Sequence, residues 1–281
     1  MSIKAKIEMC LSDKMFLYYI YYKKMNTILN LKSPKTFSEK IQWIKLYGNL
    51  ERFSDLVDKY SVRKFVEEKI GSEYLIKIYG IYDNFEEIDF EKLPNNFVIK
   101  DTHGSGSNFI CRDKEKLDMD ELREVVNQWF SKNFYTMTRE RQYKNCEHRL
   151  LVEELLEDSN GRLNDYKFFC LGGKVRIIEV DIDRFGSLKR DYYDVKWNKM
   201  ELKKGVDNSN FIIDKPKHLE KMIKMAEKLA DGIELLRVDF YYVDNTIYFG
   251  ELTFTPASGL TKFVPATEDL RLASYVDLKK Y

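Results

Sequence analysis

Two β-hairpin patterns in the second half of the sequence constrain the fold of this chain most. In chain order, their strands and turns are residues 165–171, 172–173 and 174–180, then residues 235–243, 244–245 and 246–252. The turns are Gly172-Gly173 and Asp244-Asn245, residue types that accept the positive φ angles of tight hairpin turns. The sequence shows no regular strand–helix alternation of the kind that predicts a parallel Rossmann sheet. An α+β fold with antiparallel sheets is therefore predicted.

Helix signals dominate the first 70 residues. Thr36 and Glu39 have the spacing of a capping box, which predicts the start of a helix. An apolar stripe predicts one continuous helix over residues 54–70, with Gly71 as its C-terminal stop. The apolar run over residues 15–22 is far shorter than the ~18 residues that a membrane-spanning helix needs. A buried helix is the preferred interpretation of this run, ahead of a helix that lies on a membrane surface.

Composition excludes several classes of protein. Hydrophobic residues make up 44% of the chain and charged residues 33%, which excludes intrinsic disorder. Lys and Arg number 47 against 46 Asp and Glu, so the basic excess on which nucleic-acid binders depend is missing. The four cysteines are far apart and form no CxxC pair, which favours a reduced cytosolic protein over a disulfide framework or a zinc site.

A loop of small residues follows a short apolar strand that ends in Lys100. The loop contains His103, Ser105, Gly106 and Ser107 and leads into a second strand over residues 108–111. Glycines allow backbone N–H groups to approach a ligand closely, and hydroxyls add donors, so such a loop can surround phosphate oxygens. It lacks the Gly-Lys-Ser/Thr of a Walker A loop. An ordinary flexible hairpin loop is the competing interpretation.

Three charged residues are predicted to meet across the second hairpin. Arg237 and Asp239 are two residues apart on one strand and share a face, and Glu251 lies on the adjacent strand. Two carboxylates beside an arginine suit Mg²⁺ next to a phosphate group. A solvated cross-strand ion cluster is the alternative. The flanking residues are apolar, however, and charges within a buried sheet require a functional reason.

Further charged positions carry less information when taken alone. Glu153 and Glu154 end an apolar strand, where they could accept hydrogen bonds from an adenine or a ribose. Arg190, with Lys189 and Lys196, could hold an acidic sugar, or could equally lie on a solvated strand edge. His148 and His218 are predicted to be surface residues.

Taken together and in order, these motifs resemble the ATP-grasp superfamily and, more closely, the TupA-like ATP-grasp family of bacterial cell-surface polysaccharide proteins. The resemblance covers about residues 30 to 265. The segments that carry it are residues 36–43, 56–60, 165–170, 183–185, 189–192 and 248–254. It implies an ATP-grasp fold, with two α+β lobes that clasp ATP and a helical N-terminal segment. The domains implied are residues 1–72 (helical segment), 73–155 (small lobe with the phosphate loop) and 156–281 (large lobe with the metal site).

The resemblance also implies roles for individual residues. The catalytic residues would be Arg237, Lys167 and Arg190. Mg²⁺ would be held by Asp239, Glu251 and Thr253, although Thr253 stands where the family pattern usually has asparagine, which is a better metal ligand. The ATP-binding residues implied are Lys59, Lys100, His103, Ser105, Gly106, Ser107, the adenine hinge Glu153, Glu154, Leu155 and Leu156, and the ribose-binding Asp165.

The activity that the resemblance implies is that of an ATP-dependent carboxylate–amine ligase. It would activate the carboxylate of a uronic acid as an acyl phosphate and form an amide with a small amine or amino acid, in the synthesis of a capsule or another cell-surface polysaccharide. A glycosyltransferase of the same pathway is the alternative, and a non-catalytic nucleotide-binding scaffold is a third. We expect a cytoplasmic protein, with no nucleic-acid partner. Peripheral association with membrane-bound polysaccharide assembly proteins, at the inner face of the membrane, is compatible with this interpretation.

Overall fold

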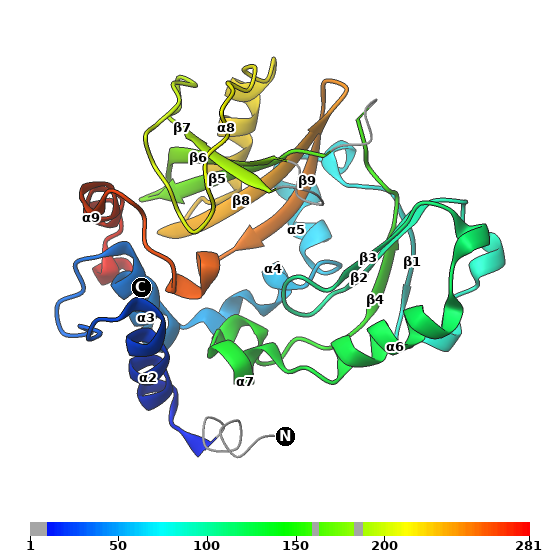
Figure 1. The fold of residues 1–281 in the computed structure, drawn as a ribbon, viewed down its shortest axis with the longest axis horizontal. Coiled ribbons are helices and arrows are strands. Elements are labelled where there is room, and N and C mark those ends of the chain that lie inside the picture. Colours follow the sequence, from blue (N-terminus) through cyan, green and yellow to red (C-terminus); the bar gives the residue numbers. More distant parts are fainter. Residues whose placement is uncertain (1–9, 159–162, 183–187) are drawn as a thin grey trace.

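The computed structural model describes residues 10–158, 163–182 and 188–281, so the segment 183–185 that contributes to the family resemblance lies outside the described residues. Two antiparallel sheets form the framework, and helices pack around them (Figure 1). The four-stranded sheet has the order β1-β4-β2-β3, and the five-stranded sheet has the order β7-β6-β5-β8-β9. The predicted α+β class is therefore confirmed. All strands of the first sheet precede residue 156, and all strands of the second follow it.

The two predicted hairpins form the centre of the five-stranded sheet. The turn residues Gly172 and Gly173 have φ angles of 63° and 74°, and Asp244 and Asn245 have φ angles of 48° and 65°. These positive values are what a two-residue hairpin turn requires. The strands are β1 (Ile78–Tyr82), β2 (Phe97–Asp101), β3 (Asn108–Cys111), β4 (Leu150–Glu153), β5 (Asp165–Leu171), β6 (Lys174–Ile182), β7 (Lys189–Tyr193), β8 (Leu235–Val243) and β9 (Thr246–Thr253).

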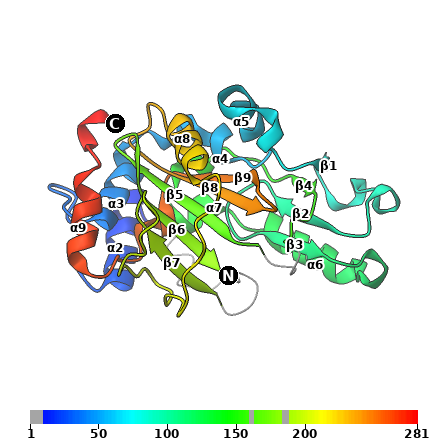
Figure 2. The ribbon, with the colours of Figure 1, turned by 90° about the horizontal axis from the view of Figure 1, so that it is seen from above.

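Each sheet buries one face beneath a helix. Helix α6 (Met119–Phe130) covers the four-stranded sheet through Leu122, Val126 and Trp129, and its first turn is capped by the side chain of Asp118. Helix α8 (Leu219–Leu229) lies across the five-stranded sheet (Figure 2) and buries Met222 among other apolar residues. Because successive strand residues point to opposite faces, the other face of each sheet is left for the space between the sheets.

The N-terminal helices between residues 37 and 70 share one core with the five-stranded sheet. The capping box at the start of α3 (Phe37–Tyr47) is present as predicted, and the helix buries Phe37, Ile41 and Ile44 in this core. Helix α9 (Ala266–Ser274) packs beside α3. The other helices are α2 (Asp13–Met25), α4 (Ser54–Val57), α5 (Val62–Ile70) and α7 (Phe134–Thr138), and the 3-10 turns are Leu50–Phe53, Ser72–Tyr74, Phe85–Glu87, Phe90–Lys92, Lys114–Lys116, Arg141–Tyr143, Pro256–Gly259 and Leu278–Lys280.

The continuous helix predicted over residues 54–70 is wrong. The chain forms α4 and α5 with a turn between them, because Asp58 Oδ1 accepts hydrogen bonds from the N–H groups of Tyr60 (3.0 Å) and Ser61 (2.6 Å). An aspartate that caps its own following residues in this way competes with helical hydrogen bonding. Within the described ranges, no helix is long and apolar enough to cross a membrane.

Candidate active site

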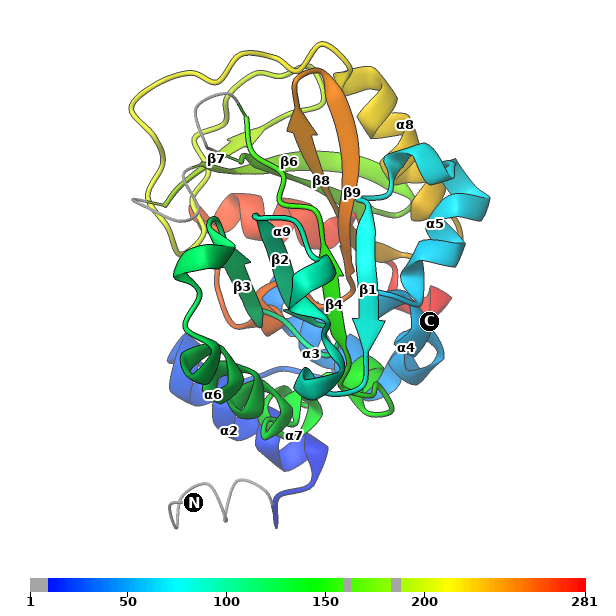
Figure 3. The same cartoon turned by 90° about the vertical axis from the view of Figure 1, so that its right-hand side faces the viewer.

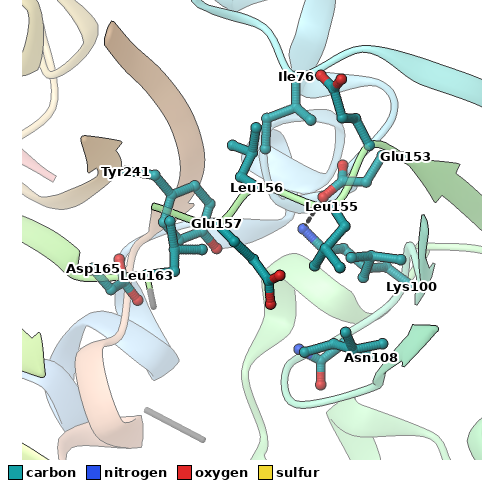
Figure 4. Close-up of a pocket in the computed structure, with 13 residues that line it drawn as sticks. Ile76, Lys100, Asn108, Glu153, Leu155, Leu156, Glu157, Leu163, Asp165 and Tyr241 are labelled. Carbon is teal, nitrogen blue, oxygen red and sulfur yellow. Dashed lines mark hydrogen bonds and ion pairs between the residues drawn. The ribbon is translucent and has the colours of Figure 1, made fainter. Parts of the chain in front are cut away.

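A pocket of about 590 Å³, partly open to solvent, lies between the two sheets (Figure 4). Strands of both sheets contribute to it, together with the segment that joins β4 to β5. Its lining consists of Ile76, Val98, Lys100, Asn108, Ile110, Glu153, Glu154, Leu155, Leu156, Glu157, Leu163, Asp165 and Tyr241. An apolar lining with a few converging polar groups is typical of a site for a small organic ligand.

The predicted hinge and ribose-binding residues all line this pocket. Leu155 and Leu156 follow β4 directly, and the N–H of Glu154 donates to the carbonyl of Lys77 (2.9 Å), so this segment is held beside the sheet. Val98 and Ile110 add apolar surface from β2 and β3. The lining of this part of the pocket is largely apolar, which suits an aromatic ring. The individual contacts of Glu153, Glu154, Leu155, Leu156 and Asp165 with a nucleotide stay predictions.

Lys100 projects from β2 into the pocket and forms an ion pair with Glu153 of β4. Both side chains are largely buried. Burial disfavours the charged ammonium, but the carboxylates of Glu153 and Glu251, with Tyr241, outweigh it and raise the pKa of Lys100. The lysine therefore carries a full positive charge at the point where the pocket meets the phosphate loop.

The side chain of Lys59 holds the loop between β2 and β3 through hydrogen bonds to its backbone. Its ammonium donates to the carbonyls of Asp101 and Gly104, both at 2.8 Å, and burial lowers its pKa. Gly104 has a φ of 74° and Gly106 a φ of 83°, conformations that glycine adopts without strain. Lys59 thus holds the backbone of the loop.

The tip of the loop is accessible to a ligand. Ser105 and Gly106 are exposed, and Ser107 is half-buried. Hydroxyl and backbone groups at this tip are therefore free of the packing that encloses the base of the loop.

His103, for which the sequence predicts a phosphate contact, forms hydrogen bonds within the protein through its ring. The N–H of Phe134 donates to Nε2 (3.1 Å), so the proton is on Nδ1, which donates to the carbonyl of Cys146 (3.1 Å). Burial lowers the pKa of the ring, which favours this neutral form. Both ring nitrogens are therefore used to hold the base of the loop. The phosphate contact itself stays a prediction, and the structure gives it no support from the ring.

One polar row crosses the five-stranded sheet on its cleft-facing side. Register pairs place Tyr192, Glu179, Lys167, Asp239 and Glu251 next to one another, in this order from β7 to β9. Directly opposed residues of adjacent strands point to the same face. The predicted juxtaposition of Asp239 and Glu251 is thus present in the structure.

Arg237 binds both predicted metal ligands. Its Nε and Nη2 donate to the two oxygens of Asp239 at 2.7 and 2.6 Å, and Nη2 also donates to Glu251 Oε1 at 2.8 Å. Burial raises the pKa of Asp239 to about 7, against the opposing pull of Arg237 and Lys167. The Asp239 side chain is 3% exposed and that of Glu251 39%, so one carboxylate lies deep and the other faces the cleft.

The donor set suits a magnesium ion that is completed by a ligand. Mg²⁺ is usually held by one or two carboxylates together with substrate phosphates and water. Asp239 and Glu251 supply two carboxylates, and Thr253 Oγ1 donates to Glu251 Oε1 (3.0 Å), which orients that carboxylate. Among the described residues, no three His, Cys, Asp or Glu side chains gather into an all-protein site. An ion here would therefore complete its coordination with oxygens of water or of a bound phosphate.

The base of the phosphate loop and one acid of the pair face the same recess. Lys59, Gly104 and Glu251 line one small pocket, and a further pocket shares Lys59 with it and Lys100 with the main pocket. Groups from both sheets therefore border one series of neighbouring pockets.

Lys167 and Arg190 are enclosed by acids. Lys167 Nζ lies 2.8 Å from Asp165, 3.1 Å from Asp181 and 3.6 Å from Asp239. Arg190 binds Asp181 at 2.5 and 2.9 Å and Glu179 at 3.1 Å, so Arg190 is partly buried rather than on a solvated strand edge. Both charges are balanced within the protein, which suits positioning of neighbouring groups.

Sequence reasoning missed several residues of the cleft. Glu179 and Asp181 are two apart on β6, the same spacing that drew attention to Arg237 and Asp239. Tyr241 follows Arg237 and Asp239 at the same two-residue spacing along β8, and it lines the pocket. This spacing could therefore have identified Glu179, Asp181 and Tyr241 from the sequence.

Antiparallel sheets that clasp such a cleft, with a phosphate loop on one and an Arg–Asp–Glu cluster on the other, define the ATP-grasp class of proteins. The model of the TupA-like ATPgrasp family matches residues 39–277, and the chain belongs to this family. No curated protein matches this sequence.

Solved structures with similarity to this chain are distant. D-alanine–D-alanine ligase from Bacillus anthracis, complexed with ATP, has 16% identity and a TM-score of 0.42, over 71% of this chain and 55% of that one. D-alanine–D-alanine ligase from Helicobacter pylori has 14% identity and a TM-score of 0.43, over 79% and 61%. Biotin carboxylase from Campylobacter jejuni has 14% identity and a TM-score of 0.45, over 86% and 53%. The chain thus spans little more than half the length of these proteins.

Proposed function

We propose that this protein is an ATP-dependent carboxylate–amine ligase that forms ADP. The observation that carries the proposal is the convergence, from opposite sheets, of Lys100, the loop anchored by Lys59, and the Arg237–Asp239–Glu251 cluster on one cleft. A cation and a glycine loop suit the phosphates of ATP, and a carboxylate pair suits the accompanying metal. The apolar part of the pocket would hold adenine, and Asp165 and Tyr241 lie where a ribose would follow.

In this proposal, Mg²⁺ bound by Asp239 and Glu251 would neutralise charge on the β- and γ-phosphates. Arg237 would lie beside the transferring phosphoryl group and stabilise the charge that develops on its oxygens. The substrate carboxylate attacks the γ-phosphorus, ADP leaves, and an acyl phosphate forms. An amine then attacks the acyl carbon, inorganic phosphate leaves, and an amide results. Lys167 and Arg190 would keep the acids around the cleft ionised and in place.

We further propose that the carboxylate belongs to a uronic acid of a capsule or another cell-surface polysaccharide, and that the amine is small, such as an amino acid. This finer assignment rests on the resemblance of the sequence motifs to proteins of bacterial cell-surface polysaccharides. The cytoplasm, where ATP is available, is the compartment that the reaction requires.

Product analysis tests the proposal. Purified protein with Mg²⁺-ATP, pooled uronic acids and pooled amines should release ADP only when both pools are present. Hydroxylamine in place of the amine should trap the activated carboxylate as a hydroxamate. Release of UDP from a nucleotide sugar without ATP consumption would replace the ligase with the alternative glycosyltransferase. Binding of ATP without turnover under any combination would favour a scaffold.

A further inference from the structure

Helix α2 carries an exposed aromatic ridge on its outer side. The ridge consists of Met15, Tyr18, Tyr19 and Tyr22, whose exposed fractions lie between 36% and 61%. These residues are spaced i, i+3, i+4 and i+7, so they form one continuous stripe along the helix. Large apolar side chains gathered on one face, rather than scattered singly, mark a surface that binds something.

The same helix is firmly attached to the rest of the protein by its other side. Phe16, Leu17, Tyr21 and Met25 are buried in a cluster of their own. Asp13, at the start of the helix, accepts a hydrogen bond from the hydroxyl of Tyr135 (2.9 Å) and forms ion pairs with Arg139 and Arg141. The expectation of a buried helix therefore holds for one face only.

The location of α2 leaves the ridge accessible. The helix lies at the end of the molecule opposite α8 (Figures 1 and 3), and none of its residues lines the main pocket between the sheets. A ligand of the ridge would therefore leave the nucleotide pocket open.

Positive charge lies on both sides of the aromatic ridge. Lys14 and Lys23 are exposed, and Lys23 Nζ lies 5.6 Å from the centre of the Tyr19 ring. Asp13 is the only acid of the helix, and it is engaged by arginines. On a helical wheel of 100° per residue, Lys14 and Lys23 lie on opposite sides of the ridge. Lysines in this arrangement can extend outward while the tyrosines between them contact an apolar surface.

We propose that the aromatic ridge of α2 docks the protein on the surface of an anionic lipid bilayer. Tyrosine prefers the interface between water and hydrocarbon, because its ring is apolar and its hydroxyl stays hydrated. The flanking lysines would meet anionic headgroups, and no acid of the helix opposes them. The helix would lie in the plane of the interface as part of a folded protein. A partner of this chemistry fits both the aromatic residues and the charge.

Vesicle sedimentation tests the proposal with the full chain. Vesicles of phosphatidylcholine with about one third phosphatidylglycerol should sediment the protein. Vesicles of phosphatidylcholine alone should sediment much less of it, because each lysine near an anionic surface increases binding about fivefold. Tyr19→Ser with Tyr22→Ser should lower binding about tenfold through lost apolar contact. Neutralising the two flanking lysines, Lys14 and Lys23, to Gln should lower it about 25-fold.

A matched control uses the exposed lysines near the start of α8. Changing Lys215 and Lys217 to Gln removes the same charge at the other end of the molecule, and binding should stay near that of the unmodified chain. Equal loss in both double-lysine variants would overturn the proposal, since it would indicate attraction by net charge alone. A Tyr22→Trp variant should shift its fluorescence to the blue on the vesicles. Concentration-dependent dimerisation abolished by the Tyr→Ser changes, with no vesicle binding, would instead assign the ridge to a second copy of this chain.

Discussion

At the scale of single residues, Arg237 determines how the acid pair can act. It donates to both oxygens of Asp239 and to one oxygen of Glu251, and its charge opposes the rise in the pKa of Asp239 that burial causes. A ligand that brings its own cation can take over these carboxylates, and the guanidinium then becomes available to phosphate oxygens. The cluster is therefore suited to a group whose charge changes during the reaction.

Arg237→Ala should lower kcat by about 10²-fold or more with little change in the KM for ATP. The reason is that a donor aimed at developing charge matters most in the transition state. Steady-state kinetics with ATP as the varied substrate measures both quantities. Arg237→Lys retains a positive charge but lacks the paired N–H donors of the guanidinium, so its kcat should lie between those of the wild-type protein and Arg237→Ala. A rise in KM at unchanged kcat would show that the guanidinium serves ground-state binding instead.

Lys100→Met should weaken ATP binding by about 1.5–3 kcal/mol, the range for hydrogen bonds to charged groups. This change also leaves Glu153 without its ion-pair partner, so Lys100→Met with Glu153→Gln is the matched variant. Isothermal calorimetry on both proteins separates loss of the ammonium from repulsion by the carboxylate. Unchanged ATP affinity in both variants would show that this pocket is not the nucleotide site.

His148 differs from its expected place on the surface. It is half-buried, its Nδ1 lies 2.8 Å from Asp101 Oδ2, and its ring centre is 4.3 Å from that of His103. The hydrogen bond with Asp101 raises the pKa of His148 above its ordinary value. The pair therefore stabilises the base of the phosphate loop most when the ring is protonated.

The stability difference between the wild-type protein and His148→Gln should depend on pH. Because the folded-state pKa is raised, the contribution of the imidazolium is full below the unfolded value of about 6.5 and is lost as pH rises through the folded pKa. Denaturant unfolding at a series of pH values should show the difference shrinking across this window. A difference that stays constant would mean that the ring acts through packing alone.

At the scale of elements, the turn between α4 and α5 places Lys59 beneath the phosphate loop. Asp58 creates this turn by accepting hydrogen bonds from two following N–H groups, and its Oδ1 also accepts one from Arg149 Nη2 (3.1 Å). A continuous helix would have no such bend at Lys59. The turn that separates α4 from α5 thus contributes to the candidate site.

Asp58→Ala should destabilise the protein by about 1–2 kcal/mol, as expected for a lost capping side chain, and should also weaken ATP binding through Lys59. Asp58→Asn retains an oxygen acceptor and should preserve most of the turn. Denaturant unfolding and calorimetry on the two variants provide the comparison. Equal effects of the two changes would assign the role of Asp58 to its charge beside Arg149.

At the scale of the whole molecule, the helical N-terminal segment and the large lobe form one body. Ile41 of α3 is fully buried in the core that contains the five-stranded sheet, and α9 from the other end of the chain packs beside the same helix. After the boundary near residue 72, the chain leaves this shared core and enters the separate core of the four-stranded sheet.

Ile41→Ala should lower the free energy of unfolding by about 2–5 kcal/mol, because it leaves a cavity in a shared core. Far-UV circular dichroism and tryptophan fluorescence should report coincident shifts. Ile28→Ala is the control, since Ile28 is 77% exposed and its loss should change stability by less than about 0.5 kcal/mol. A separate early transition in the first variant would show that the N-terminal helices unfold on their own.

Local patterns determined a large part of this structure. The strands β3, β5 and β8 have the predicted bounds, the capping box of α3 is present, and both hairpins turn at the predicted residues. Such features depend on turn conformation and on alternation along the chain, which neighbouring residues impose on one another. The direct opposition of Asp239 and Glu251 does not follow from the turn, because a regular register would pair Asp239 with Gly250; a β-bulge shifts the register by one residue.

Partners that are distant in the chain were decided by packing. Arg190 binds Glu179 and Asp181, and Lys59 binds loop carbonyls more than forty residues away. Position along a strand gives the face on which a side chain lies, but not which opposite charge it meets there. Helix α2, apolar on all sides, likewise gave no indication of which face would remain exposed. Only the packing of one side of α2 against the rest of the protein determines which face is buried and which stays exposed, because burial is a property of the assembled molecule.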